Sequence, residues 1–535
     1  MAALPFTSTV AVIGSGAMGA GIAQVAALAG HTVKLFDNRA DAVAKAIADI
    51  TLALNRQVVK GRLGPTDAAA AIARLQPALA LADVADAVLV VEAIVEQLDA
   101  KRALLRELEA IVSDDCILAT NTSSISVTAI GAGLRLPGRL AGMHFFNPVP
   151  LMALVEVVSG LATDAGVAQT VFDTAAAWGK RPVHACSTPG FIVNRVARPY
   201  YAEAWRLLAE QAADAATIDA VLRETGGFRM GPFELMDLIG HDVNFSVTQS
   251  VFAAYFNDPR FTPSVLQQEL VSAGFFGRKA GRGCYHYVDG QQQAVQVQTE
   301  APQAAPDHVS YSGHADVVAS ASAPHGAAIT DALAARLRQA GIEVALRKPH
   351  HAHGHGVDDA PVFHCNGAAV YLSDGRSATR RAADNGHANT VLIDLALDYG
   401  SATRIAVARS DQCAPAAYQA VVGLFQAAGL AVTCLDDTPG MAVMRTVAML
   451  ANEAADAVNQ GVCSAAGADT AMQQGVNYPR GPLAWADAIG LGHVIAVLDN
   501  LAASYGEDRY RVSPLLRRRH AAGAPLHAVH TSHGD

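Results

Sequence analysis

Short apolar runs separated by patterns of helical length fill the first third of the chain. Residues 10–13 form such a run, a glycine-rich turn follows, and residues 20–29 have the composition of a helix that Gly30 ends. Further apolar runs lie at residues 32–36, 88–91, 117–120, 140–145 and 155–158. Uninterrupted runs of this length are typical of strands buried on both faces. The pattern therefore predicts an open, largely parallel sheet with helices between several of its strands.

The pattern changes at Gly190. From there to about Gly240 the chain shows long helical patterns without strands, which predicts an all-helical domain. Residues 291–316 are rich in Gln, Ala and Pro and are the best candidate for a linker. Residues 317–436 again have the character of βα units, with a weaker pattern.

An internal repeat relates the two halves of the chain. Thr188-Pro189-Gly190 recurs as Thr438-Pro439-Gly440, and 439 − 189 = 250. Without a gap, the same offset relates Arg195 to Arg445, Glu203 to Glu453, Asp219 to Asp469, Gly231-Pro232 to Gly481-Pro482, and Asp237 to Asp487. Glycine, proline and aspartate at fixed spacing are hard to match by chance. We therefore predict a duplicated helical domain, together with the end of the sheet domain that precedes it.

Composition narrows the class of protein. A chain of 535 residues suggests about two to four domains, and 51% hydrophobic against 16% charged residues indicates a well-buried globular protein. The net charge of −10 without a basic block argues against nucleic acid and anionic membranes as partners. Seven scattered cysteines without a C-x-x-C pair indicate reduced thiols. The N-terminus is a poor signal peptide and no membrane span is predicted, so we expect a cytoplasmic protein.

A glycine motif, Gly14-x-Gly16-x-x-Gly19, follows the first predicted strand and opens a helix. Asp37 ends the next predicted strand, 37 − 14 = 23 positions further on. In this context the glycines permit a tight turn and close approach of a pyrophosphate to the helix N-terminus, and the acidic residue accepts hydrogen bonds from a ribose. An aspartate repels a 2′-phosphate. The motif therefore predicts NAD rather than NADP, and Arg39 leaves the strictness of that preference open.

A histidine and a glutamate lie on two other predicted strands. His144 comes at the end of one strand, and Glu156 lies inside an apolar run in the next. Taking a proton from a hydroxyl while hydride leaves carbon requires a base that is neutral near pH 7, and a carboxylate can orient such an imidazole and stabilise its cation. A carboxylate in an apolar run is costly to bury unless it is paired. The two residues predict a catalytic dyad, with a purely structural pair as the alternative.

Several motifs together resemble the L-3-hydroxyacyl-CoA dehydrogenase family. Beside the glycine motif they are Val91-Glu92-Ala93-Ile94-Val95-Glu96, Asn121-Thr122-Ser123-Ser124, His144 to Met152, Pro189-Gly190-Phe191-Ile192-Val193-Asn194-Arg195, Gly231-Pro232-Phe233-Glu234-Leu235 and Gly277-Arg278-Lys279-Ala280-Gly281. The resemblance covers roughly residues 5–288, in the family's order and spacing. Chains of this size with a second helical repeat resemble bacterial members of the family that act on a dicarboxylic acyl-CoA in phenylacetate catabolism.

The resemblance implies roles for particular residues. His144 would be the base and Glu156 its partner, while Ser123 and Asn194 would hold the substrate oxygen and the histidine. The implied NAD site consists of Gly14, Gly16, Gly19, Asp37, Glu96, Lys101, Asn147 and Lys279. Ala280 and Cys284 depart from the family pattern, where Ser or Thr and Phe are usual, and they qualify the assignment of Lys279.

Simpler interpretations stay open for several of these residues. Ser123 and Asn194 are residue types that are common in turns and caps. Glu96, Lys101 and Lys279 could belong to solvated charged faces. Lys60 and Arg62 are candidates for binding CoA phosphates, with an ordinary surface basic pair as the alternative.

The second half of the chain lacks the proposed chemistry. At the offset of 250, Asn194 falls on Met444 and Glu156 on Ala406; if the gapless register extends further back, His144 falls on Asp394. Where a second glycine motif is expected, the chain has Ser322-Ala323-Pro324-His325-Gly326. The second half is therefore interpreted as a structural copy whose helical domain packs on the first as an internal pseudo-dimer.

A histidine-rich tract, His350-His351-Ala352-His353-Gly354-His355, could bind a divalent metal. A polar surface loop is the favoured interpretation of this tract. The predicted hydride transfer needs no metal.

The predicted fold is an α/β Rossmann-type domain followed by an all-α domain, repeated in degenerate form in the second half. The expected boundaries are 1–186 for the NAD-binding domain, 187–290 for the helical domain, 291–316 for the linker, 317–436 for the degenerate Rossmann-like segment and 437–535 for the second helical domain. The expected reaction is NAD-dependent oxidation of an (S)-3-hydroxyacyl-CoA, with 3-hydroxyadipyl-CoA favoured. A 3-hydroxybutyryl-CoA substrate, a free hydroxy acid and a non-catalytic derivative of the family are the alternatives. Assembly into a homo-oligomer stays open.

Substitutions in the second half provide a first test. We expect Met444→Ala and Asp394→Ala to leave the chemical step nearly unchanged, because the second copy has lost the acid–base residues; their effects should be on stability. Single-turnover formation of NADH measures the chemical step, with circular dichroism as the control for folding. A large loss of chemistry in a normally folded variant would mean that the second half has a site of its own.

Overall fold

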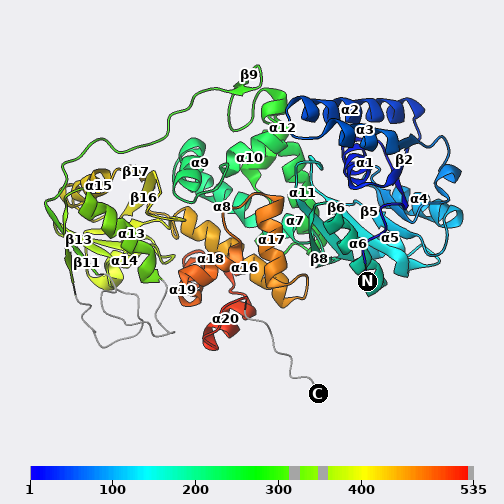
Figure 1. Cartoon of the computed structure of the whole chain (residues 1–535). Coiled ribbons are helices and arrows are strands. Elements are labelled where there is room, and N and C mark those ends of the chain that lie inside the picture. The colour runs from blue at the N-terminus through cyan, green and yellow to red at the C-terminus, as the bar shows by residue number, and fades with distance from the viewer. Residues whose placement is uncertain (1, 313–325, 348–359, 528–535) are drawn as a thin grey trace. The chain divides into compact units, whose positions relative to one another are not determined.

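The computed structural model describes residues 2–312, 326–347 and 360–527 (Figure 1). The chain forms two compact units, one made of Met1–Arg195 and Gln460–Asn477 and the other of Val196–Asn459 and Tyr478–Asp535. Ser322 to His325 and the tract from His350 to His355 lie outside the described residues. The chain therefore divides between the units at different places from the predicted boundaries.

The first unit is built on an eight-stranded sheet with the order β3-β2-β1-β4-β5-β6-β7-β8. The strands are β1 (Thr9–Ile13), β2 (Thr32–Phe36), β3 (Leu75–Pro77), β4 (Leu89–Glu92), β5 (Ile117–Thr120), β6 (Leu140–Phe145), β7 (Leu154–Ser159) and β8 (Arg181–Cys186). Strands β1 to β6 are mutually parallel, which confirms the predicted Rossmann-type sheet. The pair β7 and β8 runs in the opposite direction, because β7 is antiparallel to β6 and β8 is parallel to β7.

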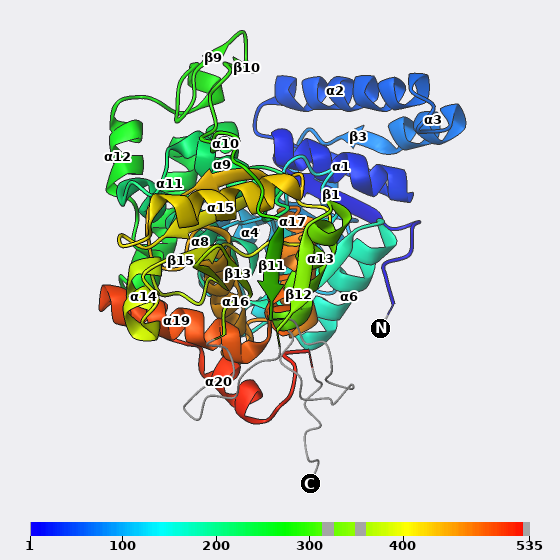
Figure 2. The same ribbon diagram turned by 90° about the vertical axis from the view of Figure 1, so that its left-hand side faces the viewer.

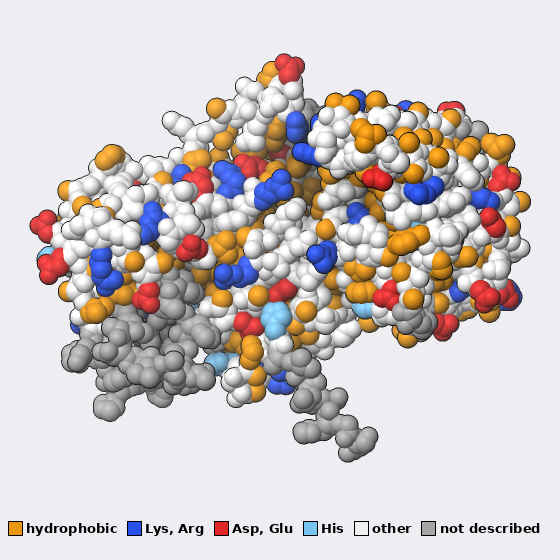
Figure 3. Space-filling model, viewed as in Figure 1, with side chains coloured by type: hydrophobic (Ala, Val, Ile, Leu, Met, Phe, Trp, Pro, Cys, Tyr) orange, Lys and Arg blue, Asp and Glu red, His pale blue; other side chains and the backbone are white. Residues whose placement is uncertain are grey.

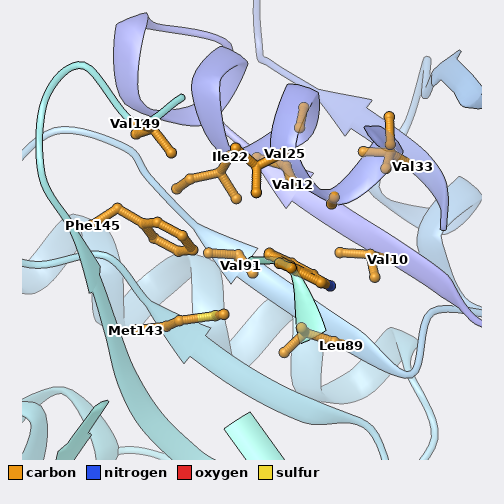
Figure 4. Packing of buried hydrophobic residues seen from close by; sticks show 14 of the residues in the cluster. Val10, Val12, Ile22, Val25, Val33, Leu89, Val91, Met143, Phe145 and Val149 are labelled. Atoms are coloured by element: carbon orange, nitrogen blue, oxygen red, sulfur yellow. The ribbon is translucent and has the colours of Figure 1, made fainter. Parts of the chain in front are cut away.

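Helices connect the strands of the first sheet. They are α1 (Ala17–Ala29), α2 (Ala40–Val59), α3 (Pro65–Arg74), α4 (Leu98–Ile111), α5 (Val127–Gly131) and α6 (Ala165–Ala177), with the short α7 (Val193–Val196) after β8. Figure 4 shows Ile22 and Val25 of α1 packed with Val12, Val91 and Phe145 from the sheet. All five are nearly or completely buried, as expected of strands with apolar side chains on both faces.

A helix from the second half of the sequence completes the first unit. Helix α17 (Ala465–Gly475) packs on β7 and β8. A Cβ added to Gly475 would lie 2.6 Å from Leu154 Cδ2, and the Cys186 amide donates to the Val462 carbonyl at 2.8 Å. Residues 460–477, which the prediction assigns to the second helical domain, therefore belong to the first compact unit. Local helical pattern cannot reveal which sheet a helix covers.

The second unit contains a seven-stranded sheet with the order β12-β11-β13-β14-β15-β16-β17 (Figure 2). The strands are β11 (His308–Tyr311), β12 (Glu343–Leu346), β13 (Phe363–Cys365), β14 (Ala368–Leu372), β15 (Thr390–Ile393), β16 (Arg404–Arg409) and β17 (Ala431–Cys434). Helices α13 (Gly326–Gln339), α14 (Ala378–Asn385) and α15 (Pro415–Ala427) pack on them. The predicted linker 291–316 is thus too long, because β11 lies within it and pairs with β12 and β13. A small hairpin, β9 (Tyr287–Val288) and β10 (Gln291–Gln292), precedes it.

The helices of the second unit repeat the sequence offset. The first copy contains α8 (Arg198–Ala209), α9 (Ala215–Glu224), α10 (Pro232–Ile239), α11 (His241–Ala254) and α12 (Val265–Ser272), and the second contains α16 (Val443–Asn459), α18 (Pro482–Ile489), α19 (Leu491–Tyr505) and α20 (Pro514–Ala521). At the offset of 250, the first and last residues of α10 coincide with those of α18. The Asp394 amide donates to the Ala406 carbonyl at 3.0 Å, at the positions where His144 pairs with Glu156. The gapless register therefore extends back into the sheet.

Buried ion pairs hold the two helical copies together within the second unit. Glu203 on α8 is completely buried and lies 2.6 Å from Arg445 Nε and 3.1 Å from Arg509 Nε. Its repeat mate, Glu453 on α16, is likewise paired with Arg260 at 3.2 Å. Burial opposes ionisation of Glu203, but the two guanidinium groups outweigh it and lower its pKa to about 2.

The surface carries charges of both signs. On the face shown in Figure 3, lysine and arginine side chains are interspersed with aspartate and glutamate. Within the described ranges, no single helix has the length and apolar character needed to cross a membrane. Among the described helices, the pair α18 and α19, bent by 100° at their junction, meets that requirement of length and composition when the two are taken together.

Removing the buried carboxylate of Glu203 should lower the free energy of unfolding more than removing one partner of an exposed ion pair. Glu203→Gln leaves two buried guanidinium groups without their counter-charge, and we expect it to lower the free energy of unfolding by about 3–5 kcal/mol. Because the folded pKa of Glu203 lies below its ordinary 4.5, the wild-type contribution is present above that pH and is lost as pH falls toward about 2. Urea unfolding measured across this pH range tests both points.

Asp499→Asn is the matched control. It removes an ion pair with Arg517 in which both side chains are about half exposed, so its effect should stay below about 1 kcal/mol. Equal effects of the two substitutions would contradict the role assigned to Glu203.

Candidate active site

The three glycines of the loop between β1 and α1 meet three different requirements. A Cβ at Gly14 (φ +102°) would lie 2.5 Å from the Ala93 carbonyl oxygen, and one at Gly19 would lie 1.8 Å from the Gly14 carbonyl oxygen. Nothing lies within 4 Å of the Cβ position of Gly16. The first glycine permits the turn, the third lets the helix pack on the strand, and the second leaves space for a ligand. The loop fits the pyrophosphate of a dinucleotide at the N-terminus of α1.

Asp37 at the end of β2 anchors this loop. Its Oδ2 accepts hydrogen bonds from the Ser15 amide at 2.9 Å and the Ser15 hydroxyl at 2.8 Å, and its Oδ1 accepts one from the Arg39 amide at 3.1 Å. Burial opposes ionisation, but these hydrogen bonds outweigh it and lower the pKa of Asp37. Asp37 is therefore an anion at neutral pH, which suits a ribose hydroxyl and repels a 2′-phosphate.

Lys101 is buried between two carboxylates. Only 1% of its side chain is exposed, and its Nζ lies 2.7 Å from Glu92 Oε1 and 3.2 Å from Glu96 Oε2. The alternative of a solvated charged face is therefore wrong for Lys101. Glu92, which sequence reasoning gave no role, anchors the lysine and also accepts from the Thr120 hydroxyl at 2.7 Å. Lys101 therefore contributes to the site through its ion pair with Glu96.

Glu96 holds the loop that carries Ser123. Its Oε1 accepts from the Thr122 hydroxyl at 2.7 Å, the Ser123 amide at 2.8 Å and the Ser124 amide at 3.0 Å. Burial opposes its ionisation, but the charge of Lys101 and the hydroxyl of Thr122 lower its pKa to about 2. The carboxylate is thus ionised at neutral pH and fixes the position of Ser123.

His144 and Glu156 are direct cross-strand neighbours on β6 and β7. The distance from His144 Nδ1 to Glu156 Oε2 is 2.6 Å, and both side chains are buried. A carboxylate accepts hydrogen bonds only, so in the neutral ring Nδ1 carries the proton and Nε2 carries the lone pair. No residue in the described part of the chain is hydrogen-bonded to Nε2. This arrangement is that of a general base whose tautomer is set by a buried carboxylate.

The second oxygen of Glu156 positions the start of α7. Glu156 Oε1 accepts from the amides of Ile192 at 3.0 Å and Val193 at 2.9 Å, immediately before Asn194. The Asn194 amide group donates to the Ser123 carbonyl oxygen at 3.4 Å. The structure therefore brings Ser123, His144, Glu156 and Asn194 together in the first unit.

The remaining predicted site residues have simpler surroundings. Asn147 is exposed in the loop after β6, and Lys60 and Arg62 are exposed after α2. Lys279 belongs to the second unit, where its Nζ lies 2.6 Å from Asp242 Oδ1 and 47% of its side chain is exposed. The proposed roles of these four residues in cofactor or CoA binding stay predictions.

Two further residues support the site and were missed by sequence reasoning. Asn121 Oδ1 accepts from the Phe145 amide at 2.8 Å and so fixes the end of β6 beside His144. Lys180 Nζ donates to the carbonyl oxygens of Val149 and Met152 at 2.5 and 2.8 Å and holds the loop after Asn147. Asn121 lies in a motif of the family resemblance and could have been found. Nothing in the local pattern marks Lys180.

Cys284, a departure from the family pattern, lies in a buried polar cluster of the second unit. Its Sγ is 3.6 Å from His241 Nε2, which is 2.7 Å from Asp237 Oδ1. The Asp237 carboxylate also accepts from the amides of Cys284 and Tyr285 at 2.9 and 3.0 Å. Burial raises the pKa of the Cys284 thiol. These contacts bind the segment of Cys284 and Tyr285 to helices α10 and α11 of the first helical copy.

A Rossmann-type sheet, a dinucleotide loop and a His–Glu pair define a nicotinamide-dependent dehydrogenase. Comparison with known families gives three matches. The NAD-binding domain of 3-hydroxyacyl-CoA dehydrogenase matches residues 9–188, and the C-terminal domain of the same enzyme matches twice, at 190–287 and 440–528. The reduced Rossmann-fold domain of 3-hydroxybutyryl-CoA dehydrogenase matches 370–439. The chain belongs to the 3-hydroxyacyl-CoA dehydrogenase family.

Individual relatives match over the whole chain or over its first half. The 3-hydroxyadipyl-CoA dehydrogenase of Escherichia coli K12 is 42% identical over 96% of this chain and 97% of its own. A solved structure described as 3-hydroxybutyryl-CoA dehydrogenase from E. coli K12 has a TM-score of 0.84 and 40% identity, over 97% of this chain and 99% of that one. The pig mitochondrial hydroxyacyl-coenzyme A dehydrogenase is 40% identical over 52% of this chain and 90% of its own.

The assigned base can be tested by substitution. We expect His144→Gln to reduce turnover by about 100- to 10,000-fold, because the amide cannot take the hydroxyl proton. Binding of NADH, measured by fluorescence titration, should stay unchanged. His184→Gln is the control, because His184 is exposed on β8 and stacks on Phe172. Undiminished turnover by His144→Gln would refute the assignment.

Proposed function

We propose that the physiological substrate of this NAD-dependent dehydrogenase is 3-hydroxyadipyl-CoA, which it oxidises to 3-oxoadipyl-CoA. The observation that carries the reaction type is the buried pair of His144 and Glu156, with Nε2 of the ring open to a hydroxyl. The choice of acyl group is supported by the full-length match to an enzyme of that name.

The chain's own residues account for the proton and for orientation. His144 Nε2 takes the hydroxyl proton, and Glu156 stabilises the imidazolium that results. The Asn194 amide and the Ser123 hydroxyl orient the substrate oxygen. NAD, which Gly14, Gly16, Gly19 and Asp37 would hold, would supply the acceptor for the hydride of carbon 3. The loss of a proton and a hydride leaves the ketone, and the reverse reaction uses the same groups.

The two helical copies are proposed to form an internal pseudo-dimer. The Cys186 amide donates to the Val462 carbonyl, and its repeat mate Asp436 donates to the Ala212 carbonyl at 2.9 Å. Arg195 likewise bonds Gln460 at 2.9 Å, where the repeat has Arg445 with Glu210 at 3.1 Å. Such reciprocal contacts are typical of a two-fold interface, in which each copy presents the same surface to the other.

The cytoplasm is proposed as the compartment. All seven cysteines are free thiols, and four of them are partly or fully exposed. Unpaired cysteines persist in a reducing environment.

Turnover of matched substrates tests the proposed function. With NAD, we expect kcat/KM to be highest for 3-hydroxyadipyl-CoA, lower for 3-hydroxybutyryl-CoA, and at least about 100-fold lower for free 3-hydroxyadipate, which lacks the CoA groups that the site would bind. NADH absorbance reports each rate. Activity on the free acid alone would indicate a hydroxy-acid dehydrogenase, and absence of activity on all three would refute the proposal.

A further inference from the structure

Three side chains with metal-binding atoms converge in the first helical copy. They are Asp237 near the end of α10, His241 at the start of α11 and Cys284 in the segment that follows α12. His241 Nε2 lies 2.7 Å from Asp237 Oδ1 and 3.6 Å from Cys284 Sγ, and the three atoms lie within 4.8 Å of one another. All three residues belong to the second unit, so the cluster depends on the packing of that unit alone.

The direction of these contacts distinguishes the cluster from a catalytic triad. In a Cys–His–Asp triad the two ring nitrogens have different partners, because one contacts the thiol and the other contacts the carboxylate. In this cluster the same nitrogen, Nε2 of His241, faces both groups. A single proton on that nitrogen can be donated to only one of them at a time. Nitrogen, oxygen and sulfur atoms that face one another in this way form the arrangement that a divalent metal ion requires.

The atom types and their spacing fit zinc. Zinc binds thiolate sulfur at about 2.3 Å and imidazole nitrogen or carboxylate oxygen at about 2.0–2.2 Å, so neighbouring ligand atoms of a tetrahedral site lie roughly 3–4 Å apart. The distance of 3.6 Å between Cys284 Sγ and His241 Nε2 is already in that range. The carboxylate of Asp237 and the ring must separate by roughly half an ångström. Cys284 is partly exposed, so water can provide a fourth ligand.

Neighbouring groups hold the three side chains in place. The Asp237 carboxylate accepts from the amides of Cys284 at 2.9 Å and Tyr285 at 3.0 Å, which fixes it beside the sulfur. His241 Nδ1 lies 3.4 Å from the side-chain amide of Gln267, and rotation of that amide presents either an N–H or a carbonyl oxygen to the ring. Metal-bound histidines donate their other N–H to such an acceptor, and metal-bound carboxylates are themselves hydrogen-bonded. The surroundings therefore suit ligands of a metal ion.

The repeat separates the aspartate from the other two residues. At the offset of 250, Asp237 corresponds to Asp487, which also accepts from a backbone amide, at 2.9 Å. His241 corresponds to Leu491, which is 8% exposed, so the second copy packs this helix start without an imidazole. Cys284 stands where the family pattern has phenylalanine. The histidine and the thiol, which are the two ligands that favour zinc, are thus additions to an apolar pattern.

We propose that Asp237, His241 and Cys284 bind a structural zinc ion. Cys284 binds as the thiolate, and its proton passes to solvent. The ion joins the end of α10, the start of α11 and the segment after α12, and it stabilises the second unit because it binds the folded protein. It takes no part in the hydride transfer, so the proposal does not depend on the identity of the acyl group.

Cobalt titration of the full-length protein tests this site. Co²⁺ occupies zinc sites, and its bond to a thiolate gives a charge-transfer absorption band that imidazole and carboxylate ligands do not give. This distinction matters because the histidine-rich tract at residues 350–355 could also bind a divalent metal. After treatment with a chelator, we expect the protein to bind cobalt with a thiolate band, and zinc to displace the cobalt. Zinc should also raise the melting temperature of the chelator-treated protein.

Substitution of either distinctive ligand should weaken binding. We expect Cys284→Ser to abolish the thiolate band, and His241→Leu to raise the dissociation constant for cobalt by about 100-fold or more. His241→Leu introduces the residue that the repeat has at this position, so it decides the test if Cys284→Ser does not fold. Cys434→Ser is the matched control, because Cys434 is also partly exposed and its thiol donates to the Leu435 carbonyl at 3.6 Å. It should leave the band and the affinity unchanged.

Three results would overturn the proposal. The first is the absence of a thiolate band at saturating cobalt. The second is a band that Cys284→Ser leaves intact, or an unchanged affinity in folded His241→Leu. The third is cobalt bound without a thiolate band, which would assign the binding to the tract at residues 350–355. These measurements do not use turnover, so failure of the proposed function would leave their result standing.

Discussion

The carboxylate of Glu156 is the constraint on which the site depends. It is completely buried, and its charge is tolerated because the His144 ring and the amides of Ile192 and Val193 all donate to it. The contacts that stabilise the buried charge are also those that orient the base and place Asn194. Neither the ring nor the turn can shift without leaving a charge or an amide unpaired, so the geometry for proton transfer is fixed by the same contacts that stabilise the fold.

In the second copy, a carboxylate stabilises the same turn without orienting a histidine. Asp394, at the position of His144, accepts from the amides of Ala442, Val443 and Met444 at 2.9, 2.7 and 2.9 Å, while Ala406 replaces Glu156. A carboxylate still caps the turn, but it comes from the opposite strand and has no imidazole beside it. Burial raises the pKa of Asp394 to about 6, against the lowering influence of those amides. A buried carboxylate thus caps this turn in both copies, whereas the first copy also places a histidine beside the carboxylate.

The sequence allowed correct prediction of features that depend on local pattern or on the internal repeat. Apolar runs located β1, β2 and β4 to β7 but not the short β3, and the extended register matched His144 to Asp394 and Glu156 to Ala406. It could not show that Lys101 is buried between Glu92 and Glu96, because that depends on the order of strands in the sheet. A one-dimensional pattern also cannot show that residues 460–477 cover β7 and β8.

The packing of residues 460–477 on β7 and β8 has a consequence for the protein in dilute solution. The helix that covers β7 and β8 is part of the same chain, so its docking depends on an effective concentration set by the connecting polypeptide and not on how much protein is present. Two separate chains making such an exchange would lose it on dilution. Here the surface of β7 and β8 stays covered at any protein concentration.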